Sequence, residues 1–440
     1  MLRIGCGAGF SADRLDPACD LVARGALDVI VFECVGERTL AFGHRDRRQD
    51  PRKGYNSLLE HRMRAVLPLC REHGTRLVTN MGAANPRAAA EATARIARAL
   101  GLDLRIACVE GDDVTALADE MELWETGGPV RDVGLELVGA NAYIGIDALI
   151  PALEAEADVV IAGRVADPSL FLAPIAHHFG WARDDWRRLG AGTLIGHLLE
   201  CGMQVTGGYF ADPGRKDVPD LAHCGFPLAE VDQEGGATVT KLPGTGGAVT
   251  ARTIKEQMLY EVHDPKRYLT PDVTADFANV RLAESAPDRV ALAGADGTER
   301  PAALKVTVGF DGGFLAEAGV SYAGPNAQAR ARLARDVVEE RMRSVHGYQG
   351  ALRLDLIGVD SLHGTATERE TDSRDIRVRA ALRSADRAHA ERLLWEVEAL
   401  LCCGPAGGGG FRGSIVPSVV TYSASIPRER VETRVEVIET

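Results

Sequence analysis

The sequence lacks the features that mark membrane, nucleic-acid-binding and disulfide-bonded proteins. No apolar run approaches the length of a membrane span, and the first residues do not include the long apolar core of a signal peptide. The net charge is −13, whereas nucleic acids and anionic membranes require a basic surface. The nine cysteines include no Cys-x-x-Cys pair, which argues against a disulfide framework. We therefore expect a cytoplasmic protein with free thiols that binds neither nucleic acid nor membrane.

What is present is the composition of an ordinary globular enzyme, with 45% hydrophobic and 26% charged residues in a chain of 440 residues. This length exceeds that of a single domain. Strand patterns alternate with helix patterns, which predicts an α/β fold with a mostly parallel, doubly wound sheet. We count about six such strands, fewer than a closed barrel requires. We expect an α/β core domain over residues 1–300, including glycine-rich loops in the middle region, and a smaller α+β domain over residues 301–440.

The clearest strand-to-helix junction begins with the apolar run Val159–Ala162, which suits a strand covered on both faces. Gly163 then lets the backbone turn, Asp167 suits a helix N-cap, and Pro168 suits the first helical position. Arg164 and Asp167 would therefore lie where open α/β sheets bind ligands, beside the positive end of a helix. Both are predicted to contact an anionic substrate. The alternative is that Arg164 only pairs with Asp167 and closes the turn.

Other predicted strands also end in polar side chains. These are Glu33 after residues 27–32, Asn80 after residues 75–79, and Glu110 and Asp112 after residues 104–109. A carboxylate at a strand end that faces a cleft is partly removed from water, as general acid–base catalysis requires. We therefore predict Glu33, Glu110 and Asp112 as candidate catalytic residues. The amide of Asn80 donates and accepts hydrogen bonds, so it suits recognition of a carbonyl or carboxylate.

Helices are expected from Pro17, over residues 58–72, over residues 86–99 with Asn85 as the N-cap, and over residues 146–155. The polar and basic segment Gly43–Tyr55 is predicted to be a mobile flap. His177 and His178 are adjacent, so their side chains point to different faces and suit a helix C-terminus better than a metal site.

Glycines concentrate in the middle of the chain. Thr245, Gly246 and Gly247 precede a predicted helix, and bare backbone N–H groups at such a place can bind phosphate or an oxyanion. The loop lacks the Gly-Lys-Ser/Thr ending of nucleotide-hydrolysing loops. We predict that it contacts the substrate. Cys201 stands four residues after His197, so it is either a nucleophile next to its base or a buried structural thiol.

The last part of the chain reads as strand, strand, helix, strand, strand, helix, strand over residues 305–309, 314–322, 327–343, 352–359, 375–382, 388–401 and 416–425. This order predicts a small α+β sandwich close to the ferredoxin-like arrangement. An antiparallel sheet leaves one face free to pack on the first domain or on another subunit, and we expect a homo-oligomer. Gly404–Gly413 is predicted to be a flexible loop, in which Arg412 either reaches a phosphate or belongs to a plain linker.

Several motifs resemble one family. They are Gly163–Asp167, Glu200–Gly202, Val205–Pro213, Pro243–Gly247, Gln257–Glu261, Asn80–Pro86, Gly111–Asp113 and Ala140–Tyr143. Nearly the whole chain is similar to the acyclic terpene utilisation (AtuA) family of bacterial proteins. The resemblance implies a ferredoxin-like C-terminal domain and a carboxylate or coenzyme A thioester from the breakdown of terpenoids and branched acids. It carries over no catalytic residues. Asn141 and Thr206 lie in these motifs and complete the predicted substrate-binding set.

The leading prediction is an enzyme of small-acid or acyl-CoA catabolism, a lyase or hydratase. One of the three candidate carboxylates would move a proton, while Arg164, Asn80 and the loop at residues 245–247 would bind the carboxylate or thioester oxyanion. Coenzyme A is expected as part of the substrate, and no set of metal ligands is predicted. One alternative is a nicotinamide-dependent oxidoreductase that uses Gly7, Gly9 and Glu33. Another is a non-catalytic ligand-binding or assembly subunit.

Overall fold

The computed structural model describes residues 1–366 and 374–440, and these form two units. Unit 1 comprises Met1–Gly309 and Thr421–Thr440, and unit 2 comprises Phe310–Val420. The last strand of the chain therefore belongs to unit 1, whereas residues 301–440 were expected to form one domain. The reason is a pairing that no local pattern reveals: the C-terminal strand Arg434–Glu439 pairs antiparallel with the strand Arg105–Glu110.

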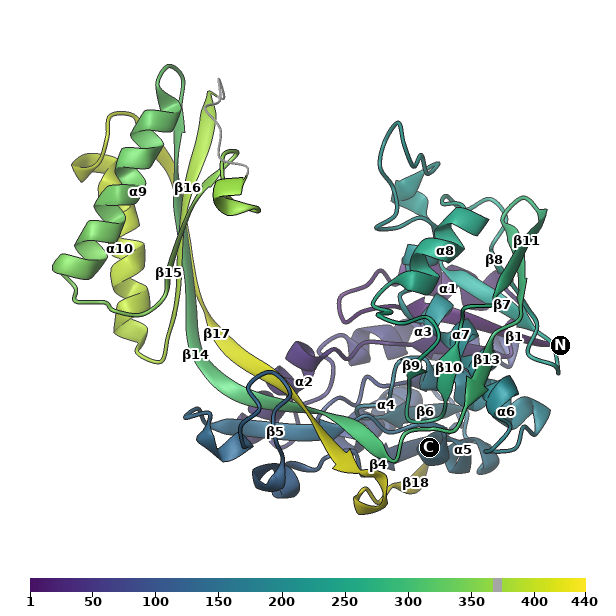
Figure 1. The fold of residues 1–440 in the computed structure, drawn as a ribbon. Coiled ribbons are helices and arrows are strands. Elements are labelled where there is room, and N and C mark those ends of the chain that lie inside the picture. Colours follow the sequence, from purple (N-terminus) through teal and green to yellow (C-terminus); the bar gives the residue numbers. More distant parts are fainter. Residues whose placement is uncertain (367–373) are drawn as a thin grey trace. The chain divides into compact units, whose positions relative to one another are not determined.

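Unit 1 is built on one large mixed sheet (Figure 1). Its central strands are parallel and lie in the order β1 (Leu2–Ala8), β2 (Val29–Phe32), β3 (Arg76–Thr79), β6 (Val159–Ala162) and β4 (Arg105–Glu110). Antiparallel strands extend both edges: β7 (Pro227–Val231), β8 (Ala237–Lys241), β12 (Arg289–Ala293) and β11 (Arg281–Ala286) beyond β1, and β18 (Arg434–Glu439) beyond β4. The prediction of a mostly parallel sheet thus describes the centre and not the edges.

Helices bury both faces of the central strands, which explains why these strands are mostly apolar. The helices of unit 1 are α1 (Asp16–Arg24), α2 (Glu37–Gln49), α3 (Leu59–His73), α4 (Pro86–Ala99), α5 (Ile146–Glu154), α6 (Ser169–Phe179), α7 (Trp186–Glu200) and α8 (Ala251–Leu259). On β2, Ile30 and Phe32 belong to the core shared with α1, α3 and α4. Val29 and Val31 belong to the core shared with α5, α6 and α7. This alternation is the two-residue period of a strand.

Two predicted helix starts have different outcomes. Asn85 caps α4, because its side chain accepts a hydrogen bond from the backbone N–H of Ala88. Asp167 does not cap α6, which begins at Ser169 with Pro168 before it and no side-chain cap. The Asp167 carboxylate instead accepts a hydrogen bond from Arg164 at 2.6 Å. An ion pair has therefore replaced the expected cap.

The predicted flap at residues 43–55 is wrong over its first half, which belongs to α2. Leu40, Ala41 and His44 are buried on one face of this helix. Arg38, Asp46 and Arg47 of the same helix are exposed, so α2 has the one-sided burial of an amphipathic surface helix. The density of charge in the sequence concealed this apolar stripe.

Three glycines of the expected glycine-rich loop region lie inside α7, where they allow close packing. A Cβ atom on Gly196 would lie 2.5 Å from the carbonyl oxygen of Pro168 and 2.8 Å from its Cα. A Cβ on Gly190 would overlap the Asp296 carbonyl oxygen, and one on Gly192 would overlap the Leu172 side chain. Gly192 and Gly196 therefore allow α7 to pack closely against α6 and the residue before it, next to the loop that carries Arg164.

Smaller pieces complete unit 1. They are the sheet β9 (Tyr268–Leu269), β10 (Thr274–Asp276) and β13 (Asp296–Thr298), the strand β5 (Leu137–Ala142), and 3₁₀ turns at Thr115–Glu120, Val130–Asp132, Gly202–Thr206, Leu221–His223 and Arg428–Arg430. Asp272 anchors the turn between β9 and β10, since its carboxylate accepts from the Ile146 backbone N–H at 2.8 Å and from the Ser169 hydroxyl at 2.5 Å.

Unit 2 is a four-stranded sheet with two helices. Its elements are α9 (Ala327–Ser344), β15 (Leu352–Ile357), a 3₁₀ turn at Gly364–Ala366, β16 (Asp375–Ser384) and α10 (Arg387–Cys403), together with most of the long strands β14 (Ala303–Ala323) and β17 (Gly408–Pro427). The sheet order is β15-β16-β14-β17, and the first residues of β14 and the last residues of β17 belong to unit 1. Both helices pack on one face around a core that includes Val320, Val338 and Leu393. The two strands expected at residues 305–309 and 314–322 are one continuous strand. The glycine run expected as a loop already pairs in β17 from Gly408 onward.

Within the described ranges, no helix is both long enough and apolar enough to cross a membrane.

Replacing Gly196 with alanine tests the close packing of α7. Alanine in a helix interior is ordinarily more favourable than glycine by about 1 kcal/mol. Here the added methyl group overlaps the backbone of Pro168, so we expect Gly196→Ala to lower the free energy of unfolding by roughly 1–3 kcal/mol in urea denaturation. Gly128→Ala is the control, because its Cβ would meet only the Thr126 hydroxyl at 3.8 Å. Equal or greater stability of Gly196→Ala would contradict the packing argument.

Candidate active site

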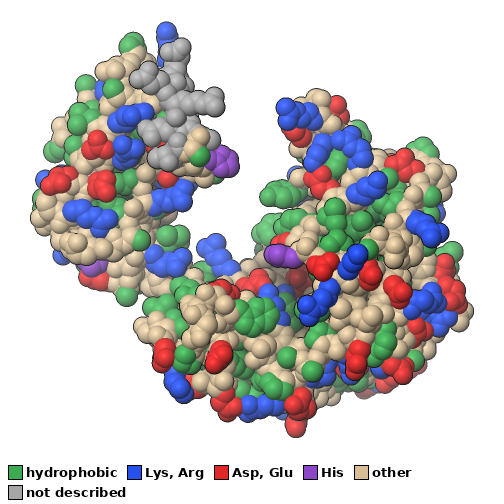
Figure 2. Space-filling model, in the orientation of Figure 1, with side chains coloured by type: hydrophobic (Ala, Val, Ile, Leu, Met, Phe, Trp, Pro, Cys, Tyr) green, Lys and Arg blue, Asp and Glu red, His purple; other side chains and the backbone are tan. Residues whose placement is uncertain are grey.

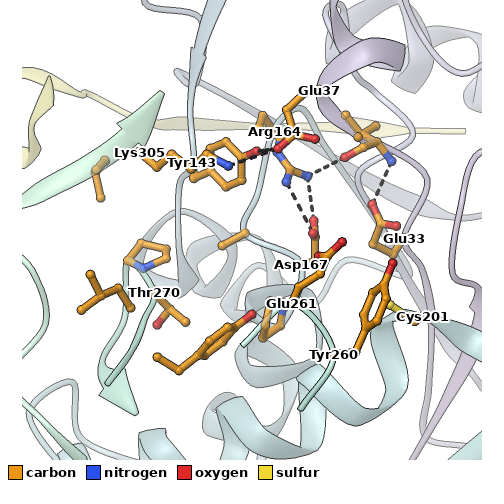
Figure 3. A pocket seen from close by; sticks show the side chains of 18 of the residues that line it. Glu33, Glu37, Tyr143, Arg164, Asp167, Cys201, Tyr260, Glu261, Thr270 and Lys305 are labelled. Carbon is orange, nitrogen blue, oxygen red and sulfur yellow. Dashed lines mark hydrogen bonds and ion pairs between the residues drawn. The ribbon is translucent and has the colours of Figure 1, made fainter. Parts of the chain in front are cut away.

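A pocket of about 630 Å³ opens in unit 1 where β1, β2 and β6 end. Its walls also come from the segment at residues 260–261, from β9 and the residues after it, and from the first residues of β14. Figure 3 shows the side chains of Glu33, Arg164 and Asp167 directed into this space. The charged lining residues are Glu33, Glu37, Arg164, Asp167, Glu261 and Lys305. Four carboxylates and two cations therefore share one concave site.

Glu33 follows β2 and is 8% exposed. Its Oε1 accepts hydrogen bonds from the backbone N–H of Val35 at 2.8 Å and from the Asn80 amide at 2.9 Å. Asn80 is held in this orientation because its own oxygen accepts from the Cys34 backbone N–H at 2.7 Å. Burial, reinforced by the negative charge of Asp167, raises the pKa of Glu33 to about 8. At neutral pH its carboxyl group is therefore predominantly protonated and lies against the pocket.

Arg164 is 2% exposed, yet its side chain lines the pocket. One Nη1 atom donates to the Val35 carbonyl at 2.5 Å and to Asp167 Oδ1 at 2.6 Å. The guanidinium also lies 3.9 Å from the centre of the Tyr143 ring, in cation–π contact. The alternative prediction was that Arg164 only pairs with Asp167 and closes the turn. That ion pair is present, but both side chains also line the pocket. Arg164 thus closes the turn and contributes to the candidate site at once.

A second charged group lies on the Tyr143 side of the pocket. The Tyr143 hydroxyl donates to Glu37 Oε1 at 2.5 Å, and Lys305 Nζ donates to the same oxygen at 3.2 Å. Burial alone would raise the pKa of Glu37, but Arg164, the Tyr143 hydroxyl and Lys305 outweigh it and lower the pKa to about 2. Glu37 is therefore ionised where Glu33 is protonated. Two carboxyl groups in one pocket with opposite protonation are typical of acid–base sites.

Asp112 and Asn141 lie beneath the pocket and support Arg164. Asp112 Oδ2 accepts from the backbone N–H of Arg164 at 2.7 Å and from the Asn141 amide at 2.8 Å. The oxygen of Asn141 is 2.5 Å from His44 Nε2 on α2. Burial raises the pKa of Asp112 to about 6. The structure places both predicted residues in a buried network that fixes the turn after β6, and neither is among the residues that line the pocket.

Other predicted residues lie elsewhere. Glu110 pairs with Arg87 at 2.9 Å and with Arg434 at 3.2 Å at the sheet edge. Thr206 is buried and donates to the Gly225 carbonyl at 2.7 Å.

The predicted substrate loop does not reach the pocket, since Thr245, Gly246 and Gly247 are not among the described residues that line it. A Cβ on Gly246 would overlap the Asp220 carbonyl oxygen, and one on Gly247 would lie 2.5 Å from the Thr206 carbonyl oxygen. Close backbone packing accounts for these two glycines.

Sequence reasoning missed several lining residues, of which Glu37, Tyr143 and Lys305 are the most informative. Glu37 is the first residue of α2 and pairs with Tyr143 and Lys305. Lys305 lies on β14, in the part of the chain assigned to the second domain. Tyr143 stood in a family motif, and that was the one signal available.

Cys201 lines the pocket, but His197 does not serve it as a base. His197 Nδ1 is 2.7 Å from Glu200 Oε1, and burial lowers the pKa of His197 to about 4. Burial also raises the pKa of the Cys201 thiol, so that the thiolate is disfavoured. The structure therefore favours an unreactive, half-buried thiol over the nucleophile, because thiolate is the reactive form.

The glycines near the N-terminus also have a packing explanation. A Cβ on Gly7 would lie 2.6 Å from the Phe32 ring, and one on Gly9 would overlap the backbone at Cys201. The helix after them starts only at Asp16. In a dinucleotide site the glycines stand directly before a helix whose N-terminus faces the pyrophosphate. Gly7 and Gly9 lie well before α1, so they do not form such a site.

In the part of the chain that the structure describes, no group of three or more His, Cys, Asp and Glu side chains is arranged to hold a metal ion.

The comparison with protein families covers nearly the whole chain. The model for the acyclic terpene utilisation family protein AtuA matches residues 2–437. This chain belongs to the AtuA family. Membership implies a part in acyclic terpene utilisation and confirms the resemblance seen in the motifs. The comparisons with curated proteins and with solved structures gave no match.

The protonation of Glu33 in this AtuA-family protein predicts a pH-dependent stability. Its folded pKa of about 8 lies above the ordinary value of 4.5, so the folded protein retains a proton that the unfolded chain releases between these values. The free energy of unfolding should therefore fall as pH rises through this window, with a weight of about 1.4 kcal/mol per pKa unit. Glu33→Gln removes this contribution, so the variant should gain stability relative to the parent between about pH 5 and 8.

Urea denaturation of the two proteins across this pH range measures the difference. Glu120→Gln is the control, because Glu120 is an exposed carboxylate paired with Arg430. Its stability relative to the parent should stay constant over the same range. A Glu33→Gln difference that does not change with pH would show that Glu33 is ionised in the folded protein.

Proposed function

We propose that this protein is an enzyme of terpenoid or branched-acid breakdown, a lyase or hydratase that acts on a carboxylate or a coenzyme A thioester. The observation that carries this proposal is the buried carboxyl group of Glu33, whose pKa burial raises to about 8, at the wall of a pocket of about 630 Å³. A carboxylic acid with a pKa near the working pH is suited both to give and to take a proton. Addition and elimination of water next to a carbonyl group need such a residue.

In the proposed hydration, Glu33 gives its proton to the carbon next to the carbonyl group, while the oxygen of a water molecule bonds to the other carbon of the double bond. The released water proton passes to the carboxylate of Asp167. Arg164 Nη1 holds this carboxylate in place by donating to its Oδ1 at 2.6 Å. Elimination reverses each transfer. Charge on the substrate carbonyl oxygen develops toward an enolate in this step, and the cations Arg164 and Lys305 line the pocket to stabilise it.

The remaining walls support a branched hydrocarbon as the rest of the substrate. Phe10, Trp124, Tyr260, Tyr268 and Leu269 all line the pocket. Apolar and aromatic walls with a few convergent polar groups are the usual composition of small-molecule sites. Tyr268 is held in place by its contact with Phe277, whose ring centre is 5.4 Å away. An acyl chain would bury its apolar surface here while its carbonyl group meets the charged side.

The decisive experiment is turnover of 3-methylbut-2-enoyl-coenzyme A and of the free acid, with the hydrated product detected by mass spectrometry. We expect Glu33→Gln to lower kcat by roughly 10²–10⁴-fold, the usual contribution of a general acid. Glu120→Gln, which alters a surface ion pair, should turn over at the parent rate. Unchanged turnover by Glu33→Gln would exclude Glu33 as the proton donor.

Ligand-induced shifts in melting temperature separate this proposal from the two alternatives. A bound ligand raises the melting temperature of the native state. A shift with the thioester, together with turnover, supports the proposed enzyme. A shift with NAD and none with the thioester would favour an oxidoreductase instead. A shift with the thioester but no turnover of it or of the free acid would favour a non-catalytic ligand-binding subunit.

We also infer a doubly wound core for unit 1 and a ferredoxin-like arrangement for unit 2. Helices on both faces of the five parallel strands support the first. The element order strand-helix-strand-strand-helix-strand and the sheet order β15-β16-β14-β17 support the second. All nine cysteines are free, as expected in a reducing compartment, which supports a cytoplasmic location.

A further inference from the structure

The helices α9 and α10 cover one face of the sheet of unit 2 (Figure 1). The opposite face carries arginines. Arg377 and Arg379 stand two residues apart on β16, so both point to the face opposite the helix-covered residues Ile376, Val378 and Ala380. With Arg412 of β17 and Glu317 of β14 they line a hollow of about 200 Å³. Three cations and one carboxylate therefore meet there, in a chain whose net charge is −13.

Two of the three guanidinium groups are held in place by the sheet. Arg377 reaches across β14 and donates to the carbonyl oxygens of Gly319 and Gly410, each at 3.0 Å. Glycine at 319 leaves room for this path, since a Cβ there would lie 2.9 Å from Arg377 Nε. Arg379 donates to the buried Asp355 at 2.9 Å through Nε. Asp355 also accepts from Arg353 at 3.0 Å, so one carboxylate orients two arginines.

We propose that this hollow binds the phosphate or pyrophosphate group of a small molecule. Neighbouring guanidinium groups repel one another, and an oxyanion between them removes that repulsion. Arginine also matches phosphate geometry, because its planar fork donates two parallel hydrogen bonds. Arg377 and Arg379 are already ordered by the sheet, so binding costs little side-chain entropy. Arg412 donates to the carbonyl oxygen of Phe411 through one Nη1 atom and lines the hollow with the rest of its guanidinium.

The same geometry gives Glu317 an opposing role. It lies on β14 at the rim of the hollow, and its negative charge competes with any bound anion. Removing this charge should strengthen phosphate binding, whereas a purely structural role for the arginines predicts no such effect. The site lies wholly within unit 2 and does not depend on the function proposed for the pocket of unit 1.

Isothermal titration of the full chain with inorganic phosphate, pyrophosphate and ADP at constant ionic strength tests the proposal. We expect one saturable site for pyrophosphate. Arg412→Gln should weaken binding about tenfold or more, since a hydrogen bond between charged groups contributes that much. The Arg412 side chain is exposed and donates to the carbonyl oxygen of its neighbour Phe411, so its replacement by glutamine should leave the fold intact. Glu317→Gln should bind pyrophosphate more tightly than the parent protein does.

Arg387→Gln is the matched control. Arg387 is an exposed arginine of the same unit, paired with Glu391 on α10 and outside the hollow. ADP that binds more tightly than pyrophosphate would identify a nucleotide as the source of the phosphate, and equal affinity would identify the phosphate groups alone. The absence of saturable binding of all three anions would overturn the proposal, as would equal losses of affinity in Arg412→Gln and Arg387→Gln.

Discussion

The burial of Arg164 is the constraint on which the candidate site depends. A guanidinium group removed from water must find partners within the protein, because an uncompensated buried charge costs several kcal/mol. Arg164 finds them in the Val35 carbonyl, the Asp167 carboxylate and the Tyr143 ring. These partners follow or precede three different strands, so their meeting fixes the ends of those strands relative to one another. Asp112 secures the arrangement from below through the Arg164 backbone.

The same charge separates the behaviour of the two glutamates of the pocket. Arg164 lowers the pKa of both, but Glu37 also has the Tyr143 hydroxyl and Lys305, whereas Glu33 has neutral donors and the repulsion of Asp167. Glu33 therefore keeps its proton and Glu37 does not. One chain thus places an acid and an anion in a single concave site. The difference arises from the deeper burial of Glu33 and from the neighbours of each residue, since the two residues are chemically identical.

Close backbone packing recurs in both units and serves different ends. In unit 1, Gly196 allows α7 to approach Pro168, which keeps the loop after β6 in place. In unit 2, Gly319 lets the Arg377 side chain lie across β14 and hold two carbonyl groups. Glycine in each case makes space for another group and does not confer flexibility. The glycine-rich character of the sequence therefore reflects tight contacts as much as loops.

The sequence by itself determined the central strands, the capped helix after Asn85, and the positions of Glu33, Asn80, Arg164 and Asp167 at strand ends, because apolar runs and helix caps are local signals. It also showed the family through its motifs. Only the tertiary structure decided that Lys305 and Glu37 meet at Tyr143, that Glu110 pairs at the sheet edge, and that Gly246 and Gly247 pack against backbone. These outcomes depend on which distant segments become neighbours, and no local pattern encodes the burial that sets the protonation of Glu33.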